Sequence, residues 1–359
     1  MRILFTACPM VGHVNTLLPL AMAAERAGHT VAFATGVDQV GRIERAGLTP
    51  WSVGPTFAEA GWPPRSPSDF VVAADKRAVD LLPRAERFRP DVVVFEETEA
   101  AGPIAAMRSG ARMVRHGLGI AAGGTGDGTE GGLGAFAEII DDFGARWQVT
   151  DLAGAVQAAP YLSICPPSLA PRSRPNVRRL RPVLAPPWPG DALPPGFAAL
   201  PHARTVHLTL GTVFGTSAAL TTALAGLRDL PVNLVVTTGG VELPPQPAHV
   251  LVAPYLPHTL LLPHCALVVS QGGAGILLGA IDHGLPQLVL PQAADQFANA
   301  KAVVRAGAGL ALTPDDVSAD RVREAAQHLL ADPGYAARAA TIRAEIAAMP
   351  DADTVVGGL

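Results

Sequence analysis

Short apolar segments alternate with helical patterns along most of this chain, and this alternation restricts the fold more than any other feature. In the first half, apolar residues at helical spacing over 14–24 follow an apolar run, and further runs lie at Thr30–Thr35 and 91–95. In the second half, such runs occupy 206–210, Asn233–Thr237, Val250–Ala253, 266–270 and 287–290. Segments that are apolar throughout suit strands buried on both faces. The pattern therefore predicts an α/β protein with two doubly wound parallel sheets.

A proline-rich stretch separates the two halves. Twelve prolines lie between residues 160 and 201. Because proline fixes φ and has no N–H, this stretch is expected to contain neither helix nor sheet and to act as a semi-rigid linker. The predicted organisation is an N-terminal domain at 1–183, a linker at 184–203, a C-terminal domain at 204–334, and a final helix and tail at 335–359. Ligands bind beyond the carboxyl ends of such strands, so a cleft between the two domains is the expected site.

The composition excludes several classes of protein. With 49% hydrophobic and 16% charged residues among 359, the chain is too apolar to be disordered. Its net charge of −4 gives no dominant field, which argues against a nucleic-acid or membrane-surface binder. The three cysteines are far apart, no targeting segment is visible, and no apolar run reaches the roughly 18 residues of a membrane span. A reducing, cytoplasmic location is therefore expected.

A glycine-rich turn stands between the predicted strand at 266–270 and the helix after it. Its residues are Gln271, Gly272, Gly273, Ala274 and Gly275. Glycine lets a ligand approach the backbone, and the helix N-terminus offers free N–H groups and a positive dipole, which suit a phosphate or diphosphate. Close packing of the strand on the helix is the alternative explanation. Thr212 ends the first strand of this half and would add a hydroxyl, with a plain structural turn as its alternative.

Two polar residues, Asp295 and Gln296, follow the next strand along the chain. The Asp295 carboxylate can accept hydrogen bonds from hydroxyl groups, and the Gln296 amide can both donate and accept. The alternative for Asp295 is a helix N-cap. The sequence thus predicts a second polar position in the same half as the glycine turn.

The first half offers a histidine and a carboxylate. His13 is predicted to lie in the loop after the first strand, where a histidine suits the role of general base. Glu96 directly follows the strand at 91–95 and would orient the imidazole, although Glu96, Glu97 and Glu99 can each be a solvated acid. The histidines show no ligand spacing, so no metal is predicted.

Several short motifs, taken in order, resemble one enzyme family. They are Gly12-His13 with Leu18-Pro19-Leu20-Ala21, Leu210-Gly211-Thr212, Pro257-His258, Gly272-Gly273-Ala274-Gly275, Gly284-Leu285-Pro286, and Asp295-Gln296 with Asn299-Ala300. Over nearly its whole length the chain resembles the nucleotide-sugar-dependent glycosyltransferases of the GT-B fold, in the actinomycete branch that decorates antibiotics and other natural products. The resemblance implies two Rossmann-like domains facing across a cleft.

The resemblance also implies roles. His13 would deprotonate the acceptor and Glu96 would hold it, in an inverting, metal-independent transfer from a TDP- or UDP-sugar to a hydrophobic aglycone, without a cofactor. The donor would be bound by Gly12, Thr212, Tyr255, Leu256, Gln271, Gly272, Gly273, Ala274, Gly275, Asp295 and Gln296. The final helix, at 335–348, would return to the N-terminal domain. The resemblance leaves open whether the protein forms a homodimer.

The chain departs from the family at two donor positions. Gln271 stands where the family usually has a histidine, and Ile276 replaces its usual hydroxyl residue. These departures favour an alternative, a non-catalytic homologue that binds nucleotide or assists a partner glycosyltransferase. A nucleotide-sugar epimerase on the same architecture is a third reading, which would not need a histidine base at an acceptor site.

Overall fold

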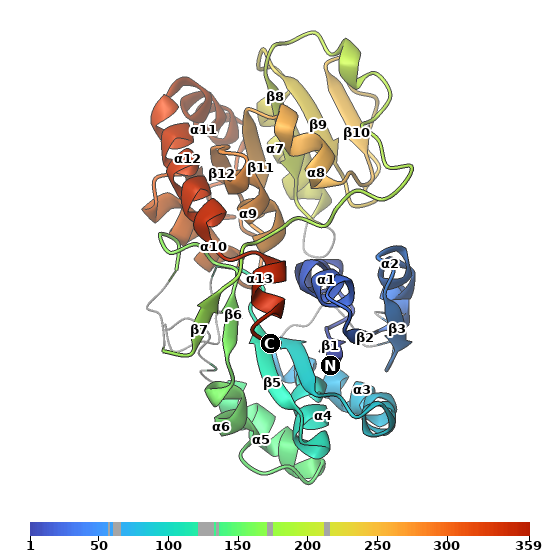
Figure 1. Cartoon of the computed structure of the whole chain (residues 1–359). Helices are drawn as coiled ribbons and strands as arrows, with labels where there is room; N and C mark the ends of the chain where they lie inside the picture. The colour runs from blue at the N-terminus through green and yellow to red at the C-terminus, as the bar shows by residue number, and fades with distance from the viewer. Residues whose placement is uncertain (57, 60–65, 121–132, 134–135, 171–174, 212–215) are drawn as a thin grey trace. The chain divides into compact units, whose positions relative to one another are not determined.

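The computed structural model describes residues 1–56, 58–59, 66–120, 133, 136–170, 175–211 and 216–359. By contacts the chain forms two compact units (Figure 1). The first comprises Met1–Cys165, Ala170–Val183 and Met349–Leu359, and the second comprises Pro166–Leu169 and Leu184–Ala348.

The first unit is built on a parallel sheet that has seven strands among the described residues, in the order β3-β2-β1-β4-β5-β6-β7. Its strands are β1 (Arg2–Thr6), β2 (Thr30–Thr35), β3 (Thr49–Ser52), β4 (Val92–Glu96), β5 (Arg112–His116), β6 (Tyr161–Ser163) and β7 (Val177–Arg179). Its helices are α1 (Val11–Arg26), η1 (Val37–Gln39, a 3₁₀ turn), α2 (Val40–Arg45), α3 (Pro67–Phe88), α4 (Ala101–Ser109), α5 (Phe136–Arg146), α6 (Leu152–Ala158) and α13 (Ala352–Val356).

Apolar side chains on both faces hold this sheet in place. Every residue of β4 is buried, and Val93 and Phe95 pack in one cluster with residues of α3, α4, α5 and α6. The long helix α3 starts at a capping box in which Ser66 and Asp69 satisfy each other's backbone N–H groups. It ends at Arg89, which adopts a left-handed conformation. Helix α3 also carries Arg77, whose side chain is buried.

The second unit repeats the arrangement with a parallel sheet of six strands in the described part of the chain, in the order β10-β9-β8-β11-β12-β13. Its strands are β8 (Thr205–Thr209), β9 (Asn233–Thr237), β10 (Val250–Ala253), β11 (Leu267–Ser270), β12 (Gln287–Val289) and β13 (Gly309–Ala311). Its helices are η2 (Phe197–Ala199), α7 (Ser217–Leu227), α8 (His258–Leu261), η3 (Leu262–His264), α9 (Ala274–Asp282), α10 (Gln296–Arg305), α11 (Ala319–Ala331) and α12 (Pro333–Ala348). Two parallel α/β units confirm the predicted fold class.

The prediction that 160–201 contains neither helix nor sheet is wrong, since the short 3₁₀ helix η2 and two strands lie there. The strands β6 and β7 both lie in this stretch and extend the sheet of the first unit, pairing in parallel through Tyr161 and Val177. Both segments are three residues long and free of proline, so each retains the N–H groups that a ladder needs. The prolines of this stretch lie outside these two strands in the sequence.

The chain enters the first unit for the last time at Met349, after the helix that the resemblance assigns to this return. Helix α12 belongs to the second unit, where it packs on α9. Beyond it, the N–H of Arg181 donates to the Pro350 carbonyl at 2.7 Å. Helix α13 packs on α1, and Arg26 bonds Asp353 there at 2.8 Å (Figure 1). Among the helices described, none is long and apolar enough to cross a membrane.

Candidate active site

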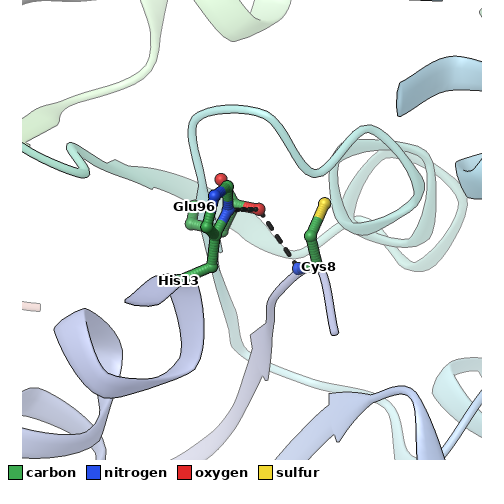
Figure 2. A group of neighbouring side chains, drawn as sticks. All are labelled: Cys8, His13 and Glu96. Carbon is green, nitrogen blue, oxygen red and sulfur yellow. Dashed lines mark hydrogen bonds and ion pairs between the residues drawn. The ribbon is translucent and has the colours of Figure 1, made fainter. Parts of the chain in front are cut away.

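His13 and Glu96 meet in the first unit. His13 lies in the first turn of α1 rather than in a loop, because the helix already begins at Val11, with the Met10 carbonyl accepting from the N–H of Val14. Glu96 is the last residue of β4, and its Oε1 lies 3.0 Å from His13 Nδ1 (Figure 2). The carboxylate is fully buried, whereas 18% of the His13 side chain is exposed. With Nδ1 donating to Glu96, Nε2 is the ring atom that can take up a proton.

The Glu96 carboxylate receives further hydrogen bonds. The N–H of Cys8 donates to Oε1 at 3.1 Å, as Figure 2 shows. The N–H of Thr98 donates to Oε2 at 2.7 Å, and its hydroxyl lies 3.0 Å from Oε1 and 2.8 Å from Oε2. Burial on its own raises the pKa of a carboxyl, but His13 and these donors outweigh it and lower the pKa of Glu96 to about 2. Glu96 therefore stays ionised, so it orients the imidazole without taking its proton.

The two neighbouring acids have other partners. Glu99 forms a buried ion pair with Arg77 of α3 at 3.1 Å and accepts from the N–H groups of Ala101 and Gly102 at the start of α4. Glu97 accepts from the N–H of Leu118 at 2.9 Å, and its pKa is raised by burial. Of the three acids considered from the sequence, Glu96 is the one that contacts His13.

One group among the described residues has the donor set of a metal site. The ligand atoms of Cys8, His13 and Glu96 all lie within 4.8 Å of one another. Burial and the nearby carboxylates raise the pKa of the Cys8 thiol well above its usual value, whereas a metal binds the thiolate. The guanidinium Nη2 of Arg77 also lies 3.5 Å from Sγ, where it would repel a cation. The arrangement thus favours a hydrogen-bonded dyad over a metal centre.

In the second unit, the glycine turn joins β11 to α9. Gly272 has φ +85°, and a Cβ at this position would lie 2.6 Å from Val289 Cγ1. A Cβ on Gly273 would lie 2.9 Å from Gln271 Nε2, whereas one on Gly275 would meet nothing within 4 Å. Gly272 is required by the turn, which delivers the chain to the N-terminus of α9 at Ala274. Free N–H groups at such a terminus can bind an anion.

The side chain of Gln271 lies across the end of β8. A Cβ added to Gly211 would collide with Gln271 Nε2, so the amide occupies the space that glycine leaves there. Gln271 Oε1 is buried and has no hydrogen-bond partner within the described part of the chain. Thr212, the other polar residue expected here, lies outside the described residues. Ile276 is 4% exposed and packs in the core with Leu262 and Val268.

Asp295 and Gln296 stand at the start of α10. Asp295 occupies the N-cap position, but its side chain makes no capping bond and instead accepts from Asn299 Nδ2 at 2.9 Å. Gln296 is buried, and its Oε1 accepts from the N–H groups of Gln292 and Ala293 at 2.8 and 3.1 Å. The Asp295 carboxylate is thus held by Asn299, and the side-chain carbonyl of Gln296 binds the backbone of the loop before α10.

Asn299 was assigned no role from the sequence. Its Nδ2 also donates to the Gly272 carbonyl at 2.9 Å, so one amide contacts both the glycine turn and Asp295. The available signal was its spacing, because a residue four positions after Asp295 lies on the same helix face.

The remaining predicted donor residues lie apart from these contacts. Tyr255 is 50% exposed, whereas Leu256 is buried in a cluster with Val235 and Leu261. Gly12 is in the first turn of α1, where a Cβ would meet nothing within 4 Å. Neither Gly12 nor Leu256 has a feature here that calls for a ligand.

Comparisons with known proteins agree on one kind of protein. Residues 222–359 match the family model described as erythromycin biosynthesis protein CIII-like, C-terminal domain. The chain is 31% identical over 384 residues to L-demethylnoviosyl transferase of Streptomyces niveus, covering 100% of this chain and 97% of that protein. The glycosyltransferase SnogD of Streptomyces nogalater has a similar structure (TM-score 0.81, 29% identity, 100% and 98% coverage). So does the spinosyn rhamnosyltransferase SpnG complexed with thymidine diphosphate (TM-score 0.81, 26% identity, 100% and 99% coverage).

Proposed function

Because the chain belongs to the GT-B glycosyltransferases of actinomycete antibiotic biosynthesis, which transfer sugars from nucleotide-sugars to natural-product aglycones, we propose a specific reaction. The enzyme inverts the anomeric carbon in one displacement, without a metal, and uses a TDP- or UDP-sugar with His13 as general base. The carrying observation is the His13–Glu96 contact, in which a buried, ionised carboxylate holds a partly exposed imidazole.

The first unit supplies the base. An acceptor hydroxyl gives its proton to His13 Nε2 as its oxygen attacks the anomeric carbon. The new C–O bond forms on the face opposite the diphosphate, the bond to the diphosphate oxygen breaks, and the configuration inverts. Glu96 stabilises the imidazolium that results, because its pKa of about 2 keeps it negative.

The second unit supplies the donor site. In this proposal the N–H groups at the start of α9 and the Gln271 amide bind the diphosphate and stabilise its charge as it leaves. Asp295 accepts hydrogen bonds from sugar hydroxyls, and the exposed Tyr255 borders the nucleotide base. These neutral N–H donors take the place that a divalent cation has in metal-dependent transferases, which supports a metal-free reaction.

The test is transfer by a His13→Ala variant with the best donor and acceptor found by screening the wild type. We expect kcat to fall on the order of 10²–10⁴-fold, because a positioned base contributes about that much. Binding of TDP, measured by calorimetry, should be unchanged. His29→Ala, a histidine variant in the same unit, is the control and should transfer normally. Full transfer by His13→Ala would disprove the base assignment.

A second candidate function rests on the donor turn. Gln271 is neutral, and Ile276 packs in the core, so neither adds charge or a hydroxyl to the diphosphate site. A non-catalytic homologue that assists a partner glycosyltransferase would share this turn. It would show no transfer with any donor, and TDP would bind weakly or not at all.

A further inference from the structure

Asn299 connects the two parts of the donor site within the second unit. Its side chain is fully buried, and Nδ2 donates to the Gly272 carbonyl and to Asp295 Oδ2, each at 2.9 Å. The two acceptors belong to different loops, one after β11 and one before α10. An amide nitrogen has two hydrogens, so these two bonds use both of them.

The Gly272 end of this connection has little freedom. The N–H of Gly272 donates to Ser270 Oγ at 3.1 Å, and its carbonyl accepts from Asn299. Its positive φ and the close approach of Val289 exclude a side chain. The turn is therefore held at this residue through both its N–H and its carbonyl, and loss of the Asn299 bond would leave the N–H bond to Ser270 Oγ.

The Asp295 end contains an unusual backbone conformation. Ala294, directly before it, has φ +54°, a region that costs a non-glycine residue on the order of 1–3 kcal/mol. Contacts around the loop must hold this conformation. They come from Gln296 Oε1, which accepts from the preceding N–H groups, and from Asn299, which bonds the carboxylate.

We propose that Asn299 is a positioning residue that couples the sugar-binding carboxylate to the diphosphate-binding turn. When Asp295 is in place, Nδ2 keeps its second hydrogen on the Gly272 carbonyl, and the turn keeps the shape that presents its N–H groups. Binding at either loop then favours the bound geometry of the other, since such coupling is reciprocal. This inference rests on the proposed function, because it takes the turn and Asp295 as parts of one donor site.

TDP alone is the probe, because it lacks the transferred sugar whose hydroxyls Asp295 would bind. We expect Asp295→Ala to weaken TDP binding about threefold to tenfold, although the substituted carboxylate makes no contact with the diphosphate. Asn299→Leu, which is close to isosteric, should weaken TDP binding by a similar factor. The double variant should be no weaker than Asn299→Leu, because the path from Asp295 to the turn is already broken. Calorimetry measures all four dissociation constants.

Asn233→Leu is the matched control. Asn233 is also a buried asparagine of this unit, but it bonds the backbone of His202 and the Thr205 hydroxyl, far along the chain from the turn. Its replacement should lower the thermal midpoint and leave the TDP dissociation constant within about twofold. If Asn299→Leu does not fold, Asn299→Ser replaces it, since a serine hydroxyl cannot reach both acceptors.

Two other outcomes separate the inference from the function beneath it. If the wild type binds TDP and Asp295→Ala binds it equally well, or if the two single effects add in the double variant, Asn299 does not couple the loops and the inference is overturned. If the wild type does not bind TDP, the proposed donor site itself is wrong, and the inference falls with it.

Discussion

The two parts of the proposed site are built from different groups. In the first unit, Glu96 is surrounded by donors, from His13, Cys8 and Thr98, so its charge and orientation are set by side chains and backbone together. In the second unit, the turn is made of glycine backbone, and Gln271 Oε1 has no partner among the residues that the structure describes. Among the described residues, both oxygens of the Glu96 carboxylate accept hydrogen bonds, whereas Gln271 Oε1 accepts none.

The difference follows from what each part must bind. A general base has to hold one ring in one orientation and tautomer before the acceptor arrives, which requires a fixed, charged partner. A diphosphate brings its own charge, so the protein needs to offer only N–H groups at the right spacing. The following predictions test whether the first part depends on charge and the second on backbone shape.

After His13→Ala, the largest effect is expected for Glu96→Gln. An amide cannot balance the imidazolium, and its NH₂ group would face donors such as the N–H of Cys8 or Thr98. We expect kcat to fall on the order of 10²–10³-fold, with TDP binding unchanged. Steady-state kinetics and calorimetry measure the two quantities. Glu97→Gln is the matched control, since Glu97 does not contact His13; an equal loss in both variants would mean that charge at Glu96 is not what matters.

Acid stability provides a second comparison, because each unit has a fully buried histidine outside its part of the site. Burial lowers the pKa of His116 on β5 and of His207 on β8 from 6.5 to about 4. Both rings are neutral in the folded state, so their contribution to stability is complete above pH 6.5 and is lost as the pH falls towards 4. The loss is about 3 kcal/mol per residue, as an order of magnitude.

A His207→Phe variant tests this in the second unit. It keeps the ring contact with His258, at 5.5 Å between centroids, and removes one of two titrating rings, since burial also lowers the pKa of His258, to about 3. The drop in thermal midpoint from pH 7 to pH 5 should be smaller than in the wild type. His264→Phe, at an exposed position of the same unit, should keep the wild-type pH dependence. An unchanged pH dependence in His207→Phe would show that burial of this ring does not set the acid limit.

Gly272→Ala tests the dependence on backbone shape. The methyl group would lie 2.6 Å from Val289 Cγ1 at a positive φ, so we expect a loss of about 2 kcal/mol in unfolding free energy and weaker TDP binding. Gly275→Ala adds the same methyl group where nothing lies within 4 Å and should bind TDP normally. Chemical denaturation and calorimetry provide the two readings. Equal TDP affinities in both variants would contradict the assignment of the turn.

The sequence predicted the parallel α/β fold because buried strands such as Thr30–Thr35 and Asn233–Thr237 are apolar nearly throughout, a local signal that needs no tertiary information. It missed β3, β5, β6, β7 and β13, since these segments of three to five residues contain no long apolar run. His13 was expected in a loop because the helical spacing of apolar residues is visible only from Val14, but the helix begins three residues earlier, at Val11.

The candidate site shows the same limit. Glu96 was ranked first among three acids from its position after the strand, and the partners of Glu97 and Glu99 appear only in three dimensions. The second contact of Asn299, with the Gly272 carbonyl, joins residues 27 positions apart, which no helical spacing reveals. Residues that act through backbone conformation, or through a bond to a carbonyl far along the chain, can therefore be identified only from the structure.

The smallest effect is expected for Gln271→His. This variant measures how much TDP affinity is lost because the donor turn has a neutral amide in place of a charged group. The Gln271 amide lies against Gly211 and Gly273, and a protonated imidazole in its place would give the diphosphate a charged donor. Charged hydrogen bonds are about twice as strong as neutral ones, so TDP should bind about 5–30-fold more tightly, or about 1–2 kcal/mol. Calorimetry with TDP and UDP, at pH 6 and pH 8, should find the gain larger at pH 6, where histidine carries more charge. Gln292→His, which changes another glutamine of this unit, should give no gain.

Tight binding of TDP by the wild type would mean that the backbone N–H groups of the turn suffice for the diphosphate, which sharpens the contrast with the charged contact in the first unit. Binding that appears only in the variant would instead favour the non-catalytic homologue, because the natural turn would then be too weak for a donor.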